Sequence, residues 1–559
     1  MDRSDSDIPP ILVTEGLGAT GRPTRSSPRQ LPSERWFRTF AFLVPLSLVV
    51  AGAPASLQAR LNPFDGGLLL TLARFTSWDR LPYRDLWTLY GPGPPAFGSL
   101  VMRVFGSGTL PIRLSYVALH AALTLGVYAI SRRYAPRWAA ALLAVPVATF
   151  GYSSNHFHFA GSVALILWGL WFILRSGGGD RVSIRQVATG CFLIGWSFWG
   201  RYELAPIAAA GVIAVWVFLA PRLGSRGWIV LVAGLLPPAL FLVYLIAVVG
   251  LDRAWLNLVE YPISYYPRPY CRGLPPVWGP AVGALSAPLR GRLWTPDELT
   301  LGANTFVAPI VGVLAFLVGF RGRAARTPRS IVSMVLGLLV VLMWLGMRGR
   351  AGAEPHPVWY ALTPALAVTA SGLARPVLRR AVMLTSGLLF LTTAMVFWAP
   401  DLVRPWTDWP PYHPRFGFAR VEEDAVFDAG IWAEVAEVVH QHASPEAPIF
   451  VALTSNTGHH SNMAIFYWLT ERPPATRFIE FDPCLTDTAP VQRMIVSDLN
   501  NVDVVVATGY FPQEAPPLGA PSKVLDRYIA RHFVPAYVAS MLYRDDVQVL
   551  VRRGDVRAS

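Results

Sequence analysis

Residues 64–70, "FDGGLLL", and residues 81–95, "LPYRDLWTLYGPGPP", place two carboxylates in a chain that is otherwise strongly apolar. Asp65 comes just after the first hydrophobic stretch, and Asp85 precedes a cluster of prolines and glycines. Proline removes a backbone donor and fixes φ, so the prolines stiffen this segment. The two acids are therefore expected in a constrained loop next to a membrane span.

The composition of the whole chain predicts a polytopic α-helical membrane protein. Of its 559 residues 53% are hydrophobic and 15% are charged, and the mean hydropathy is +0.40. A soluble domain carries about 25% charged residues. An apolar stretch of about 20 residues crosses a bilayer as a helix. A single such stretch can be a buried core helix, but a long series of them is typical of a membrane domain.

We expect about eleven transmembrane helices. The fifth and third of them are short for a bilayer, so the count can change by two. The expected spans lie near residues 39–57, 113–130, 138–151, 157–174, 187–200, 204–220, 228–249, 304–320, 331–347, 357–373 and 381–398.

The distribution of charge predicts the orientation of the chain. The net charge is +13, but residues 401–559 hold 20 acidic and 13 basic residues, so the positive charge lies before them. Most of it is arginine in alternate short loops, which the positive-inside rule places in the cytoplasm. The N-terminus is then cytoplasmic and the C-terminal domain periplasmic or extracellular, in a plasma (inner) membrane. Basic charge spread over loops does not indicate a nucleic-acid partner. The arginine-rich loops are 131–137, 175–185, 221–227, 321–330 and 374–381.

The expected domains follow from these patterns. A disordered cytoplasmic N-terminus (1–36) is followed by the transmembrane domain (37–400), a proline-rich linker (401–417) and an extracytoplasmic α/β domain (418–559). In the last domain, strands alternating with helices predict a mainly parallel sheet between helices. Its expected helices are 422–442, "AIFYWLTE" (464–471) and "TAPVQRMIVSDL" (488–499), and its expected strands are 448–453, 476–481 and 503–508.

The predicted outer face collects the ionisable residues other than loop arginines. The first outer loop, 58–112, contains two apolar pieces too short to span, which we expect to be amphipathic helices in the membrane interface. A long outer loop covers 251–303. Ionisable groups at the membrane tend to mark sites. The candidates for substrate binding are Arg84, Tyr90, His156, His158, Arg201, Glu203, Tyr265, Arg268, Arg348, Arg350 and His356.

Several motifs occur in an order that resembles GT-C type integral-membrane glycosyltransferases. An Asp after the first span is followed by "PYRDLWTLYGPGPPAFGSLVMRVFG" (82–106) and "IRLSYVALHAALTLGVYAISRRY" (112–134). The likeness continues through "HFHFAGSVALILWGLWFILR", "GRYELAP", "HPVWYALTPAL" and "IFYWLTERPPATRFIEF". This superfamily includes protein O-mannosyltransferases, lipid A aminoarabinose transferases and arabinofuranosyltransferases.

The resemblance implies transfer of a sugar from a polyprenyl-phosphate donor to an extracytoplasmic glycan, lipid or protein acceptor. Asp65 is then the expected general base, and Asp85 the next catalytic candidate, either to position the acceptor or to coordinate a divalent ion. Many relatives have Asp-Glu where this chain has Asp65-Gly66, which weakens the case for a metal. A divalent cation stays open as the cofactor, with Asp65, Asp85 and His158 as possible ligands.

The chemistry of the reaction suits these residue types. A carboxylate can take the proton of an acceptor hydroxyl as attack develops. A lipid phosphate leaving group needs charge stabilisation, and arginine matches its oxygens in two-point geometry. Arg201, Arg268, Arg348 and Arg350 compete for that role, and we favour Arg201 together with His356.

Two other functions remain open at this point. A polytopic lipid-glycan transporter or flippase should show paired halves and broken helices, and the sequence has no internal symmetry. A ligase that uses a lipid-diphosphate glycan is the nearest enzymatic alternative, and arginine content does not separate it from a monophosphate enzyme.

Overall fold

A computed structural model of the chain describes residues 32–58, 65–77, 79–88, 90–150, 157–177, 182–201, 204–265, 307–322, 327–347, 356–386, 409, 412–416, 429–454, 462–481, 485–508, 522–540 and 546–554. Residues Met1–Phe40 and Ala41–Ser559 form two compact units. Of the first unit the structure describes the beginning of helix α1 (Pro32–Gln58). The helices, sheet and site below belong to the second unit.

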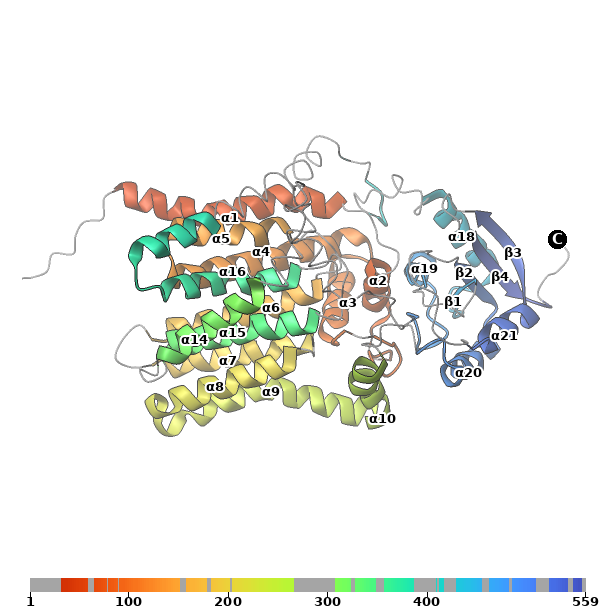
Figure 1. Cartoon of the computed structure of the whole chain (residues 1–559). Helices are drawn as coiled ribbons and strands as arrows, with labels where there is room; N and C mark the ends of the chain where they lie inside the picture. Colours follow the sequence, from red (N-terminus) through yellow and green to blue (C-terminus); the bar gives the residue numbers. More distant parts are fainter. Residues whose placement is uncertain are drawn as a thin grey trace, which may run out of the picture. The chain divides into compact units, whose positions relative to one another are not determined.

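Long apolar helices make up the first part of this unit (Figure 1). Within the described residues, four helices are long and apolar enough to cross a membrane: 109–134, 205–226, 228–249 and 328–345. Several shorter apolar helices pack with them around one hydrophobic core. The chain is a multi-pass helical membrane protein. Its helices in this part are α4 (Thr109–Tyr134), α5 (Arg137–Phe150), α6 (Phe157–Arg175), α7 (Ile184–Trp196), α8 (Ala205–Leu223), α9 (Trp228–Tyr244), α10 (Leu251–Trp255), α14 (Ala308–Arg321), α15 (Pro328–Met347) and α16 (His356–Ser371).

Described residues of three arginine-rich loops, 131–137, 175–185 and 321–330, lie together at one end of these helices. The Tyr134 hydroxyl donates to the carbonyl of Arg329 over 3.0 Å, and the Arg329 guanidinium lies 4.8 Å from the centre of the Tyr134 ring. Gly177 packs against Pro328. The described segments at the ends of α7 and α9 contact the first outer loop instead. For these described loops the grouping agrees with the arginine distribution; the remaining loops, and the side on which each group lies, stay predictions.

Arg113 links the two helices between which the first outer loop lies. This residue of α4 is 7% exposed, and its guanidinium donates to the carbonyl of Leu57, near the end of α1, over 2.6 Å. A cation at the C-terminus of a helix also complements the helix dipole. The end of α1 and the start of α4 are therefore held together.

The two short helices expected in this loop are present, but only one of them has an exposed apolar face. In α3 (Gly93–Phe105) the side chains of Leu100, Val104 and Phe105 are 59%, 63% and 72% exposed. In α2 (Asp65–Phe75) residues 68–73 are all buried. The prediction of an amphipathic interfacial helix is therefore wrong for α2, because this helix is covered by the C-terminal domain.

Helix α2 packs directly on α19 (Ile465–Thr470) of the C-terminal domain. The Thr71 hydroxyl donates to the carbonyl of Ala464 over 2.7 Å. A β-carbon on Gly67 would lie 2.6 Å from Cβ and 2.7 Å from the backbone nitrogen of Ile465. The second glycine of "FDGGLLL" is thus required for this close approach, whereas the sequence alone shows only a flexible pair.

Replacing Gly67 with alanine is expected to destabilise the protein by about 1–3 kcal/mol, the usual cost of overpacking a well-packed core. The added methyl group meets backbone atoms of Ile465, which cannot rotate away. Thermal unfolding in detergent should show a lower Tm than wild type. Gly161→Ala is the matched control, since its β-carbon would meet only Leu119 Cδ1 at 4.0 Å. Equal Tm values for the two variants would contradict the expectation.

The C-terminal part is a four-stranded sheet with helices on both faces. The strand order is β1 (Phe450–Leu453), β2 (Val504–Thr508), β4 (Asp546–Arg552) and β3 (Phe533–Ser540). Side chains alternate along β2, with Val504 and Val506 in one core and Val505 in the other. The first core includes α18 (Ala429–His442) and α19, and the second includes α20 (Ala489–Asp498) and α21 (Val524–His532). The predicted α/β domain is present.

Two details of this domain differ from the prediction. Only β1 and β2 pair in parallel, whereas β4 pairs antiparallel with β2 and β3, so the sheet is not mainly parallel. Residues 476–481, expected to be a strand, form none. Their backbone groups bond elsewhere: the Arg477 carbonyl accepts from the Trp87 N–H over 2.7 Å, and Asn462 binds the carbonyl of Ile479 and the N–H of Phe481.

Candidate functional site

The segment 81–86 of the first outer loop is a tight turn that Asp85 fixes. Its Oδ2 accepts from the Leu81 N–H over 2.9 Å and from Arg84 Nε over 2.6 Å. Tyr83, in the middle of the turn, has φ of 66°, a conformation that is costly for a residue with a β-carbon. The described contacts of the Asp85 carboxylate are therefore those of a residue that holds the backbone of its own loop.

The turn is docked on the helices that end near it. The Tyr244 hydroxyl donates to the carbonyl of Pro82 over 2.6 Å, and Arg253 Nη1 donates to the carbonyl of Arg84 over 3.0 Å. The Tyr83 ring is fully buried and meets Phe241 edge-on. Two π-helical segments, Leu245–Val249 and Leu256–Tyr265, flank α10 at this point. Such segments occur frequently at functional sites.

Trp87 fixes the other side of the loop to the C-terminal domain. Its ring is fully buried and packs on Phe478, with 5.9 Å between ring centres. The Arg477 guanidinium lies 5.8 Å from the Trp87 ring and 5.0 Å from the Phe478 ring. Burial, with a smaller effect of the nearby Arg253, lowers the pKa of Arg477 to about 10, against the opposing effect of Asp498 and Asp85. It remains a cation at neutral pH.

The proline-glycine segment brings Tyr90 onto Arg201. The Arg201 side chain is 3% exposed, and its guanidinium carbon lies 5.2 Å from the centre of the Tyr90 ring. The Gly91 N–H donates to the carbonyl of Gly200 over 3.2 Å. A β-carbon on Gly91 would lie 2.1 Å from the carbonyl oxygen of Trp199, and one on Gly93 would lie 2.8 Å from it. The "GPGPP" motif thus lets the loop approach the end of the segment Ser197–Trp199.

The prolines of this motif start a helix as well as stiffening the loop. Pro92 is the N-cap of α3, and proline occupies the first turn. Proline is well tolerated there, since the missing N–H has no partner inside the helix. This rigid segment therefore has Tyr90 at its N-terminal end and the start of α3 at its C-terminal end.

Replacing Gly91 with alanine is expected to separate Tyr90 from Arg201. The new methyl group would overlap the Trp199 carbonyl oxygen, so the loop must move away from residues 199–201. We expect at least a tenfold fall in the activity that the site supports, with a lower Tm. Gly161→Ala again serves as the control, because it adds a methyl group without such an overlap. Wild-type activity in Gly91→Ala would show that this close approach does not matter for function.

Asp65 is the first residue of α2. A carboxylate at a helix N-terminus is favoured by the free N–H groups and the helix dipole. The buried residues that follow, together with the Gly67 contact to Ile465, hold the start of this helix against the C-terminal domain. The side chain of Asp65 lies outside the described part of the structure.

The structure brings four of the predicted residues together as two pairs at the first outer loop: Arg84 with Asp85, and Tyr90 with Arg201. The other predictions lie outside the described residues and stay predictions. Five of these residues are outside the described residues entirely: His156, Glu203, Arg268, Arg348 and Arg350. Of four others only the backbone is described, and not the side chain: Asp65, His158, Tyr265 and His356. Within the described residues, no group of three His, Cys, Asp or Glu side chains is placed to hold a metal ion.

Sequence reasoning missed the residues that position the loop. Tyr244, Arg253 and Arg477 each bond or pack against residues 82–87 from a distant part of the chain. Arg477 did carry a signal, as a single cation inside the apolar run "TRFIEF". The positive φ of Tyr83 had no signal in the sequence, since it occurs at an aromatic residue and not at glycine or asparagine.

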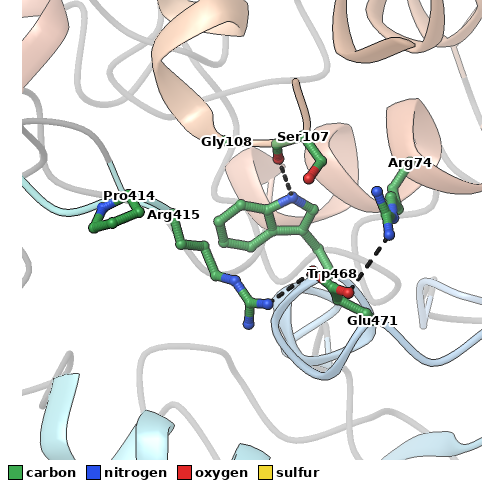
Figure 2. A pocket seen from close by; sticks show the side chains of 7 residues that line it. All are labelled: Arg74, Ser107, Gly108, Pro414, Arg415, Trp468 and Glu471. Carbon is green, nitrogen blue, oxygen red and sulfur yellow. Dashed lines mark hydrogen bonds and ion pairs between the residues drawn. The ribbon is translucent and has the colours of Figure 1, made fainter. Parts of the chain in front are cut away.

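A cavity of about 200 Å³ lies beside α19 (Figure 2). Glu471 bridges two arginines in it: its Oε1 accepts from Arg415 Nη2 over 2.8 Å, and its Oε2 is 3.6 Å from Arg74 Nη2. Trp468 Nε1 donates to the carbonyl of Ser107 over 3.1 Å. The lining residues are Arg74, Ser107, Gly108, Pro414, Arg415, Trp468 and Glu471.

Comparisons with known proteins add similarities of overall structure. No model of a protein family matches the chain, and no curated protein matches it in sequence. Among solved structures, ArnT from Cupriavidus metallidurans bound to undecaprenyl phosphate matches with a TM-score of 0.48 and 13% identity, over 92% of this chain and 98% of that one. The oligosaccharyltransferase of Archaeoglobus fulgidus, complexed with zinc and sulfate, matches with a TM-score of 0.45 and 13% identity, over 90% and 79%. A structure of the same enzyme, AglB, with an inhibitory peptide and a dolichol-phosphate matches with a TM-score of 0.45 and 12% identity, over 85% and 70%.

These matches have low TM-scores and low identity, so the resemblance to GT-C type glycosyltransferases continues to rest on the sequence motifs. At such identities and TM-scores they assign no residue of this chain a role. The chemistry of the site rests on the residues of the chain itself.

Proposed function

We propose that the protein is a membrane glycosyltransferase that moves a sugar from a polyprenyl-phosphate donor to an extracytoplasmic acceptor. The observation that supports this most is the burial of Arg201 beneath Tyr90, where the stiffened first outer loop meets the segment that follows α7. A buried guanidinium is costly in a membrane protein and tends to mark a site. Its planar donors suit a phosphate group.

The proposed reaction uses two groups of this chain. The Asp65 carboxylate takes the proton from an acceptor hydroxyl as the hydroxyl oxygen forms a bond to the anomeric carbon of the sugar. The bond from that carbon to the phosphate oxygen breaks, and the lipid phosphate leaves with the electron pair. Arg201 stabilises the negative charge that develops on this oxygen. Because a lipid phosphate is already an anion at neutral pH, charge stabilisation matters more than a strong acid.

The contacts that fix the first outer loop meet a requirement of such a site. Transition-state stabilisation depends on groups that are held in place before the reaction. The turn at 81–86 is fixed by Asp85 and by bonds from Tyr244 and Arg253, and Trp87 anchors it to the C-terminal domain. Asp85 then acts as a positioning residue for Tyr90, in place of the catalytic role expected from sequence.

The test is an assay of the purified protein in detergent with radiolabelled polyprenyl-phosphate sugars. Mannose, arabinose, glucose and galactose donors are each incubated with and without an envelope glycan extract as the acceptor. We expect release or transfer of the label from at least one donor. Label that stays on the lipid with every donor, while the corresponding lipid-diphosphate glycan is consumed, would favour a ligase instead.

A further inference from the structure

The cavity beside α19 has the charge of an anion-binding site. It contains two arginines and one glutamate, which leaves one unbalanced positive charge. Its volume of about 200 Å³ corresponds to about six or seven water molecules at ~30 Å³ each, roughly the space of one sugar ring. The arginines come from α2 and from the segment 412–416, and Glu471 follows α19, so three separate parts of the chain supply the charges.

Glu471 holds its carboxylate in this cavity at a conformational cost. It is the C-cap of α19 and has φ of 56°, a left-handed conformation for which glycine or asparagine is usual. The left-handed conformation is unfavourable for a residue with a β-carbon. A glycine there would end the helix without this cost, but it would leave Arg74 and Arg415 without the carboxylate between them.

The two arginines differ in how firmly they are held. Arg415 donates to the carbonyl of Leu469 and to Glu471, and its guanidinium lies 5.8 Å from the centre of the Trp468 ring. Arg74 has only the loose 3.6 Å ion pair with Glu471 among the described residues, and its side chain is 34% exposed. Most of its five N–H donors therefore remain available to a ligand.

Helix α2 connects this cavity to the proposed base. Asp65 is the first residue of the helix and Arg74 lies in its last turn. Nine steps of about 1.5 Å place the two residues roughly 14 Å apart along the helix axis. That distance is comparable with the length of a few linked sugar units.

We propose that this cavity binds one sugar unit that carries a single anionic group, a carboxylate or a phosphate. Arg74 and the remaining donors of Arg415 bind the anion, and Glu471 accepts hydrogen bonds from the sugar hydroxyls. The assignment of this unit to the acceptor rests on the proposed function, whereas the binding itself does not.

Isothermal titration calorimetry on the full-length protein in detergent tests this proposal. The probes are glucuronate, glucose 1-phosphate, neutral glucose and inorganic phosphate, with no donor lipid present. We expect one of the two anionic sugars to bind at least tenfold more tightly than glucose or inorganic phosphate. The preferred probe identifies the anionic group as a carboxylate or a phosphate.

Substitutions in the cavity should change this affinity in opposite directions. Arg74→Gln removes a charge-assisted hydrogen bond and should weaken binding about tenfold. Glu471→Gln removes the competing carboxylate and should strengthen it. Arg103→Gln is the matched control, because Arg103 lies at the end of α3, outside the cavity, and donates to the carbonyl of Thr76.

Three results would overturn the proposal: no binding of either anionic sugar, binding of inorganic phosphate as tight as that of the preferred anionic sugar, or unchanged affinity in Arg74→Gln. Because no sugar is transferred in this measurement, transfer activity without binding would overturn this inference alone and leave the proposed function standing.

Discussion

Replacing Asp65 with asparagine is expected to lower kcat for sugar transfer by about 10²–10⁴-fold, the usual contribution of a general base. Asparagine has nearly the same size as aspartate and is equally acceptable at the start of a helix, so α2 should keep its position. The side chain loses only its ability to take the acceptor proton. Donor binding should change little, because the proposed phosphate contact belongs to Arg201. Single-turnover transfer from the labelled donor, with Tm as the measure of folding, gives this result directly.

Asp85→Asn is the comparison that separates a base from a positioning residue. Its carboxylate oxygen holds the Leu81 N–H and Arg84, so the substitution should loosen the turn and lower Tm. We expect a smaller loss of kcat, of about tenfold, because Tyr90 is displaced while the base remains. The reverse order, with Asp85→Asn the more damaging and Asp65→Asn near wild type, would transfer the role of base to Asp85.

The membrane helices could be predicted from sequence because their signals are local. An apolar stretch of sufficient length specifies a helix by itself, and arginine marks the loops of one side. The meeting of Tyr134 with Arg329, at one end of the helices, follows from this pattern. The two helices of the first outer loop were found for the same reason, since each is an apolar run next to glycine or proline.

The burial of α2 could not be predicted, because hydrophobicity does not say what covers a helix. "GLLLTLARF" suits a membrane interface and a protein core equally well, and the packing on α19 depends on residues almost 400 positions away, as the hydrogen bond from Thr71 to Ala464 shows. The strand prediction for residues 476–481 failed through the same kind of contact. Its backbone is satisfied by Trp87 and Asn462, so an apolar run that looks like a strand does not join the sheet.

The candidate site was predictable in its residue types but not in its arrangement. Asp65, Tyr90 and Arg201 were chosen as ionisable or aromatic groups of the outer loops. Sequence gave no reason for Arg201 to lie under Tyr90 in particular. That pairing depends on two glycines whose value is steric, because Gly91 and Gly93 alone allow the loop to reach the Trp199 carbonyl.

Replacing Arg201 with glutamine is expected to lower kcat/KM for the polyprenyl-phosphate donor by about 10²–10³-fold, as the loss of a preorganised charge-stabilising group does elsewhere. Glutamine keeps a polar side chain, although a shorter one, and carries no charge for the leaving phosphate. Arg201→Lys should recover part of the loss, since it restores the charge without the planar two-point geometry. A transfer assay over a range of donor concentrations separates kcat from KM for both variants.

Arg329→Gln supplies the matched control, because Arg329 also lies over a tyrosine ring, at 4.8 Å, but at the other end of the helices. If Arg201 acts on the donor phosphate, Arg329→Gln should keep transfer within about twofold of wild type, since an exposed cation–π contact contributes only about 0.5–1 kcal/mol and does so through stability. Equal losses in the two variants, tracking equal falls in Tm, would mean that Arg201 merely holds the first outer loop in place. A large loss confined to Arg201→Gln, with Lys intermediate and Tm preserved, requires the guanidinium to act on the reacting phosphate.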